Sequence, residues 1–356
     1  MLAAGVAVGA ADTAGITRAL TISRPPRTLR EKVGQVFIVS LRGLTPDFGF
    51  LRDLERHAYG GVILYQRNCQ SASQIRALLT ELQAISPTRL LVCVDQEGGR
   101  VTRIHYGAPV YPWEATYGQI GVPHHVYHDA TRTARALRSL GLSLNLAPVV
   151  DVLANPHSPI GRRSYGRSPS LDASLALAAI RGYQHHGLAA TAKHFVGLGH
   201  TSIDSHRSLP VVPLSLAQLE ASDLIPFRTA IGAGVSTVLV AHVLLSQIDP
   251  YHPASLSPTV IQGVLRRRLG FQGIVMTDSL IMGAVPAGDE ARAAELALAA
   301  GADVLLVAGD HDLKSGLLTE SYERVLSAVQ SGRIPESRLD EAVGRIQALK
   351  RRYPAL

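Results

Sequence analysis

Eight short apolar runs recur along the chain, with room for a helix between each run and the next. They lie at residues 35–40, 61–65, 90–95, 143–146, 189–194, 237–242, 273–277 and 304–307. The runs are almost continuously hydrophobic, which is typical of strands buried on both faces of a parallel sheet. Eight β/α units predict an α/β protein, a single-domain (β/α)8 TIM barrel, with a doubly wound open sheet as the alternative.

Signals for helix starts stand between these runs. Ser71 with Gln74 and Ser215 with Gln218 have the spacing of a capping box, in which a side chain satisfies the first free N–H groups of a helix. The segment 336–351 has apolar residues on one face only and predicts an amphipathic helix near the end of the chain.

The domain boundaries follow from composition. Of the 356 residues, 46% are hydrophobic and 18% are charged, so the chain can bury a large core. No linker divides it, and we expect one barrel domain over residues 27–356, working as a monomer. Residues 1–26 are expected to be a tail or the remnant of a signal peptide. We expect a cytoplasmic protein without a membrane span, although the apolar stretch 2–11 keeps export open as an alternative.

Several functional classes are not expected. The net charge is +7, but the arginines are scattered and no basic block is interleaved with aromatic residues, so nucleic-acid binding is not expected. The two cysteines, Cys69 and Cys93, cannot form a disulfide framework. No Cys/His spacing resembles a zinc site, and neither a metal nor an organic cofactor is implied.

Polar residues end four of the apolar runs. Asp95 ends the third run, Lys193 and His194 the fifth, His242 the sixth, and Asp278 follows the seventh. The carboxyl ends of all barrel strands open onto one face, where barrel enzymes have their active sites. Each residue alone is compatible with a cap, a turn or, for His242, a packed histidine. Together they predict a polar site at the mouth of the barrel.

Two features of the sequence suggest the chemistry. Asp278 follows an apolar strand and is a candidate nucleophile, base or metal ligand, or the N-cap of the next helix. Asp204 and His206 stand two apart; in an extended segment both point the same way, so the carboxylate could orient the imidazole as a general acid/base. A carboxylate nucleophile with a separate proton carrier suits retaining double displacement at an anomeric carbon.

Other polar residues are candidates for substrate binding. The segment 95–103 contains two carboxylates and two arginines, suited to bidentate hydrogen bonding to vicinal hydroxyls or to an anion. A buried Arg–carboxylate pair bracing this turn is the structural alternative. Arg163 and Asp151 are weaker candidates after the fourth run. A serine hydrolase is not expected, because no G-x-S-x-G elbow is present.

These motifs, in this order, resemble glycoside hydrolase family 3, in particular its bacterial β-N-acetylhexosaminidase branch. The resemblance covers about residues 27–350 and is carried by the segments 29–35, 60–64, 95–103, 145–152, 160–166, 193–210 and 270–278. It implies a barrel that removes non-reducing terminal β-linked N-acetylglucosamine from small carbohydrates, typically peptidoglycan fragments. The alternatives are a β-glucosidase or β-xylosidase on the same barrel, phosphorolysis, or a sugar-binding protein without catalysis.

The resemblance also assigns roles to residues. It implies Asp278 as the nucleophile and His206 as the acid/base, oriented by Asp204. It implies that the terminal sugar is held by Asp95, Arg103, Arg163, Lys193 and His194.

The chain departs from the branch pattern in the loop after Lys193. Val196, Leu198 and His200 replace a proline, a histidine and an acidic residue, and Ser279 replaces a second aspartate. We expect a looser loop, and His200 could partly replace the polar group lost at position 198.

Overall fold

The computed structural model describes residues 24–285, 288–310, 314 and 316–355. The expected tail, 1–26, lies outside these residues except for its last three, and its nature stays a prediction. The apolar stretch 2–11 lies wholly outside them.

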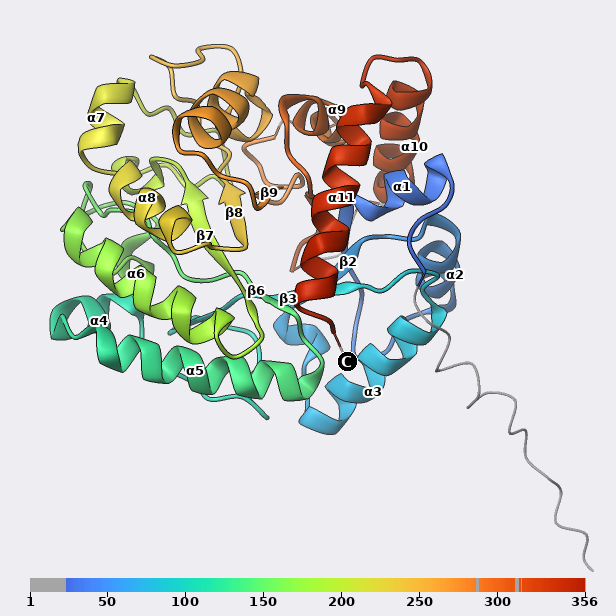
Figure 1. Ribbon diagram of the computed structural model, residues 1–356, viewed down its shortest axis with the longest axis horizontal. Coiled ribbons are helices and arrows are strands. Elements are labelled where there is room, and N and C mark those ends of the chain that lie inside the picture. Colours follow the sequence, from blue (N-terminus) through green and yellow to red (C-terminus); the bar gives the residue numbers. More distant parts are fainter. Residues whose placement is uncertain (1–23, 286–287, 311–313, 315, 356) are drawn as a thin grey trace, which may run out of the picture.

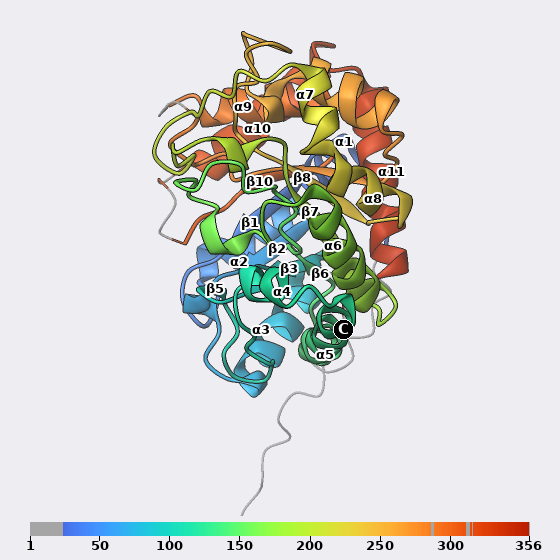
Figure 2. The same ribbon diagram turned by 90° about the vertical axis from the view of Figure 1, so that its left-hand side faces the viewer.

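Eight parallel strands form a closed barrel (Figures 1 and 2). They are β1 (Phe37–Ser40), β2 (Gly61–Leu64), β3 (Leu91–Val94), β6 (Leu144–Asn145), β7 (Ala189–Phe195), β8 (Thr237–Val240), β9 (Ile274–Thr277) and β10 (Leu305–Val307). Hydrogen-bonded neighbours run β10-β1-β2-β3-β6-β7-β8-β9. A parallel bridge between Met276 and Val304 joins the two ends. Each expected run supplies one strand, so the (β/α)8 barrel is confirmed and the open sheet is wrong.

Helices surround the barrel (Figure 1). The α-helices are α1 (Leu29–Gln35), α2 (Phe48–His57), α3 (Ala72–Ile85), α4 (Glu114–Ile120), α5 (Pro123–Leu140), α6 (Pro169–Gln184), α7 (Leu216–Ala221), α8 (Leu224–Gly232), α9 (Glu290–Ala300), α10 (Leu317–Gln330) and α11 (Glu336–Arg352); Thr259–Arg268 is a π-helix. The Ser215–Gln218 capping box is present, whereas Ser71 caps its helix without the return bond from Gln74. The expected C-terminal helix is α11.

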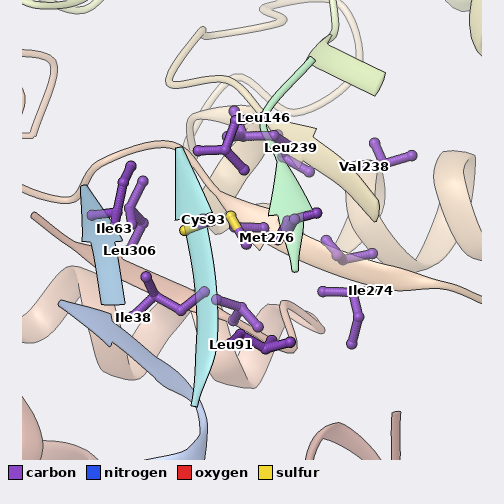
Figure 3. Close-up of a cluster of buried hydrophobic side chains, with 14 of the residues drawn as sticks. Ile38, Ile63, Leu91, Cys93, Leu146, Val238, Leu239, Ile274, Met276 and Leu306 are labelled. Atoms are coloured by element: carbon purple, nitrogen blue, oxygen red, sulfur yellow. The ribbon is translucent and has the colours of Figure 1, made fainter. Parts of the chain in front are cut away.

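Aliphatic side chains fill the barrel interior. Figure 3 shows Ile38, Ile63, Leu91, Cys93 and Met276 meeting inside the strands, and all five are almost inaccessible to solvent. Each such side chain contributes roughly 1.5–3 kcal/mol of transfer free energy on burial. Because the interior is packed, a ligand site has to lie at an end of the barrel.

Two local features shape the carboxyl end of the barrel. A short hairpin, β4 (Gln96–Gly98) and β5 (Val101–Thr102), follows β3 and folds over the mouth. Strand β7 has the most residues of the barrel strands and shifts its register against β8 between Lys193 and Phe195.

Within the part of the chain that is described, no helix is long and apolar enough to cross a membrane.

Candidate active site

A cavity of about 450 Å³ opens at the carboxyl ends of the strands. Its walls include seven of the predicted site residues, namely Asp95, Arg103, Arg163, Lys193, His194, His206 and Asp278. The eighth, Asp204, lies behind His206 and binds it. The cavity has the size of a small-molecule site and brings together residues far apart in the sequence.

A buried cluster of charges forms one wall. Lys193 Nζ lies 2.6 Å from Asp95 Oδ1 and 2.5 Å from Glu97 Oε1. Arg163 donates two hydrogen bonds of 2.8 Å to the Glu97 carboxylate. Burial alone would raise the pKa of Glu97, but Arg163 and Lys193 hold it well below its usual range. Burial would likewise lower the pKa of Lys193, and Asp95 and Glu97 raise it instead. Glu97 and Lys193 are therefore both ionised at neutral pH.

His194 extends this cluster. Its Nδ1 lies 2.8 Å from Asp151 Oδ2, and its backbone N–H donates to the same oxygen at 3.1 Å. Arg163 Nη2 lies 3.3 Å from His194 Nε2. A guanidinium can only donate, so Nε2 accepts and Nδ1 carries the proton that is donated to Asp151. The ring is thereby fixed in one tautomer and one orientation.

Asp278 follows β9, is half-buried and lines the same cavity. Its Oδ1 accepts the N–H of Ser279 at 2.8 Å. Burial alone would raise the pKa of Asp278, but the surrounding polar groups, this N–H among them, lower it below its ordinary value. The carboxylate is thus ionised and only partly bound, as a nucleophile must be.

His242 is a packed residue beneath Asp278. Its Nε2 donates to Ser279 O at 2.9 Å, its Nδ1 accepts from Ser255 Oγ at 2.6 Å, and burial lowers its pKa. The interpretation of His242 as a packed histidine is confirmed.

The Asp204–His206 pair is present, but its geometry differs from the one expected. Asp204 Oδ1 accepts both the backbone N–H of His206, at 2.9 Å, and its Nδ1, at 2.8 Å. Arg207 N–H donates to Asp204 O at 2.9 Å. The segment is therefore a turn and not extended, and the turn brings the two side chains together. The expected pairing is confirmed, while the reason given for it was wrong.

Arg103 lines the cavity. Its guanidinium carbon lies 5.8 Å from the centre of the Tyr65 ring, and its backbone N–H donates to Gln96 Oε1 at 3.1 Å. Within the described residues its buried Nε has no hydrogen-bond partner. A buried donor without a partner is costly, so this atom is available to a bound ligand.

The sequence offered Glu97 only as one of two carboxylates in the segment 95–103 and Asp151 only as a weaker candidate, and it assigned neither of them a role. A buried Arg–carboxylate pair does brace the 95–103 turn, but its arginine, Arg163, lies outside the turn, 66 positions from Glu97. No local spacing could identify that partner. Asp310 and Arg67 were also missed; Asp310 lies at the cavity rim, 3.5 Å from Arg67.

The unusual loop residues lie away from the mouth. Leu198 is buried, and its carbonyl accepts from Ser158 Oγ at 2.8 Å. His200 Nε2 lies 2.8 Å from Asp223 Oδ2. His200 does not line the cavity, so the expectation that it replaces a polar group at the mouth is wrong. Ser279 does line it, and its hydroxyl donates to Ala308 O.

Nowhere among residues 24–285, 288–310, 314 and 316–355 do three or more His, Cys, Asp or Glu side chains gather closely enough to hold a metal ion.

A closed barrel with an ionised aspartate and an Asp–His pair at one mouth defines a class, the barrel glycosidases. The model "Glycosyl hydrolase family 3 N terminal domain" matches residues 28–349. The chain belongs to glycosyl hydrolase family 3.

Relatives within the family are similar over most of the chain. A beta-hexosaminidase of Stenotrophomonas maltophilia (strain K279a) is 37% identical, over 82% of this chain and 86% of its own length. The β-N-acetylglucosaminidase of Paenibacillus sp. FPU-7 matches with a TM-score of 0.88 and 40% identity, over 92% of this chain and 63% of that longer chain. NagZ from Neisseria gonorrhoeae, solved with N-trifluoroacetyl-D-glucosamine, matches with a TM-score of 0.77 and 31% identity, over 92% and 91%.

Proposed function

We propose that this glycosidase removes non-reducing terminal β-linked N-acetylglucosamine with retention of configuration. One observation carries the mechanism: an ionised Asp278 and the Asp204-bound His206 line the same cavity. The N-acetylated sugar is supported by the names of the similar proteins, of which one was solved with an N-acylated glucosamine.

In the proposed first step, a carboxylate oxygen of Asp278 bonds to the anomeric carbon as the bond to the leaving oxygen breaks. His206 gives its proton to that oxygen. In the second step, a water oxygen bonds to the same carbon, the bond to Asp278 breaks, and His206 takes the proton of the water. Asp204 orients the imidazole through its hydrogen bond to Nδ1.

The charge cluster holds the sugar in this proposal. Asp95 Oδ2 is not used by Lys193, which binds Oδ1, so it can accept a sugar hydroxyl. Arg103 and Lys193 can donate to sugar oxygens. Because Arg163, Glu97 and Asp151 already fix their neighbours, little reorganisation is needed when the sugar arrives.

As the natural substrate we propose small peptidoglycan fragments with a terminal N-acetylglucosamine. This proposal is supported by the resemblance of the motifs to the bacterial branch. A monomeric state and a cytoplasmic location stay predictions.

The test is hydrolysis of a matched pair, aryl β-N-acetylglucosaminide and aryl β-glucoside, in phosphate-free buffer. We expect turnover of the first and little of the second. Faster hydrolysis of the glucoside would indicate a β-glucosidase. Binding of the sugar without hydrolysis of either substrate would indicate a sugar-binding protein without catalysis. A rate that rises with added phosphate would indicate phosphorolysis.

A further inference from the structure

A second, smaller cavity shares Glu97 with the sugar site. Its volume is about 30 Å³, and it is lined by Glu97, Tyr111, Glu114, Tyr117, Asp129 and Tyr183 among others. That is room for about one water molecule. The cavity lies under α4, which begins at Glu114 and packs against α5 and α6 (Figure 1).

Glu114 is the unusual group in this cavity. It is only 5% exposed, and its Oε1 accepts the N–H of Val149 at 3.1 Å. In the described part of the chain, its buried Oε2 has no partner, and neither has the buried Tyr111 hydroxyl. Burial, and after it the nearby Glu97 charge, raise the pKa of Glu114 well above its usual range. Burial thus favours the neutral carboxyl, whose O–H can bind a water or the Tyr111 hydroxyl.

The Val149 backbone connects Glu114 with the sugar site. Val149 forms a parallel bridge with Lys193. Lys193 N–H donates to Pro148 O at 3.3 Å, and Val150 N–H donates to Lys193 O at 2.7 Å. Two residues after Val149, Asp151 holds both the backbone N–H and the imidazole of His194.

We propose that Glu114 is a positioning residue for the sugar site: by accepting the Val149 N–H, it fixes the backbone from which Lys193 and Asp151-bound His194 reach the sugar. The inference rests on the proposed function and adds to it a residue that touches no substrate. Only a hydrogen-bond acceptor is needed at this position, and a negative charge is not. Displacing two sugar-binding groups by even ~1 Å weakens binding and can cost about 10²-fold in rate.

The test compares Glu114→Gln with Glu114→Met. Gln keeps a neutral acceptor of similar size, and Met keeps the size without the acceptor. Tyr111→Phe is the matched control, because it removes a polar atom from the same cavity and leaves the Val149 bond intact. For each variant we would measure kcat, KM, and the Kd of N-acetylglucosamine by calorimetry, below the unfolding temperature of that variant.

We expect wild-type values for Gln and Phe. For Met we expect a Kd raised about 10-fold and kcat/KM lowered about 10- to 100-fold. If Glu114 only stabilised the fold, fewer molecules of the Met variant would be active, but the Kd of N-acetylglucosamine for those molecules would not change. Wild-type Kd in the Met variant, or equal losses in Gln and Met, would overturn the inference.

If the Met variant does not fold, Glu114→Asp replaces it, because its carboxyl is one methylene too short for Val149. Wild-type KM and Kd in that variant would equally overturn the inference. The proposed function fails separately, if the wild-type enzyme neither binds the sugar nor turns over its aryl glycoside.

Discussion

The two sides of the cavity are built in different ways. On one side, the side chains of Lys193 and Glu97 are 3% and 2% exposed, and each has several partners. On the other, the His206 side chain is 68% exposed and is held only by Asp204 within the described residues. The sugar-holding side is therefore fixed before a ligand arrives, whereas the proposed proton carrier depends on one turn.

This difference has a physical reason. Buried charges are tolerated only when every charge is paired, so the cluster has to be fully connected. A general acid/base must exchange protons with leaving group and water, and access to solvent serves that role. The predictions below separate the two sides, from the largest expected effect to the smallest.

Asp278 lines the same cavity, and its loss should have the largest effect. For Asp278→Asn we expect kcat to fall by roughly 10⁴–10⁶-fold, because the neutral amide cannot form the glycosyl-enzyme bond. Initial rates with the aryl N-acetylglucosaminide measure this. Asp310→Asn is the control, since Asp310 lines the same cavity at its rim. Equal losses in both variants would remove Asp278 from its proposed role.

His206→Ala removes the proposed proton carrier from the exposed side of the cavity. With a poor leaving group, we expect a loss of about 10²–10⁴-fold in kcat/KM. A dinitrophenyl leaving group departs without protonation, so the loss in its cleavage step should be much smaller. Equal losses for the two substrates would contradict a proton-transfer role. Asp204→Asn should give the same pattern with a smaller loss.

Lys193→Met disrupts the buried charge cluster. It leaves Asp95 without its cation and Glu97 with only Arg163, so we expect a loss of about 3 kcal/mol in the free energy of unfolding. Urea unfolding measures it. Arg30→Met is the control, because it breaks the exposed pair with Glu323 and should leave the midpoint almost unchanged. Equal midpoints for the two variants would mean that the buried cluster does not stabilise the fold.

The ion pair of His200 with Asp223 can be tested through the pH dependence of stability. Its hydrogen bond to Asp223 raises the pKa of His200, against the opposing effect of burial. A raised folded-state pKa contributes stability that is complete below the unfolded value of about 6.5 and is lost as the pH rises through the folded value. The Tm of the wild type should therefore be higher than that of His200→Gln at pH 5.5. This difference in Tm should become smaller towards pH 8.5.

The control for this prediction is His124→Asn, an exposed histidine on α5. An equal pH-dependent gap in this variant would show that the effect does not come from the His200–Asp223 pair. A gap between wild type and His200→Gln that stays constant with pH would show that the ion pair contributes nothing.

Strands were easier to predict than contacts. A parallel strand buried on both faces needs a continuous apolar run, so all eight strands could be predicted from local sequence. The residues ending those strands were then placed at one mouth by the topology alone. Most of the predicted site therefore followed from the fold class and the resemblance together.

The pairings within the site could not be predicted in this way. Glu97 meets Arg163 only because a hairpin folds over the mouth, and Asp204 meets His206 through a turn. His200 faces Asp223 rather than the cavity. These contacts depend on loop geometry, which a residue pattern does not specify.

The most direct test of the account is to trap the glycosyl-enzyme. The enzyme would be incubated with a 5-fluoro analogue of N-acetylglucosaminyl fluoride, which forms the intermediate faster than water releases it, and then digested for mass spectrometry. We predict one added fluorosugar on the peptide that contains Asp278, and none in Asp278→Asn. A hydrolysing enzyme that carries no adduct, or carries it on another residue, would contradict the central claim.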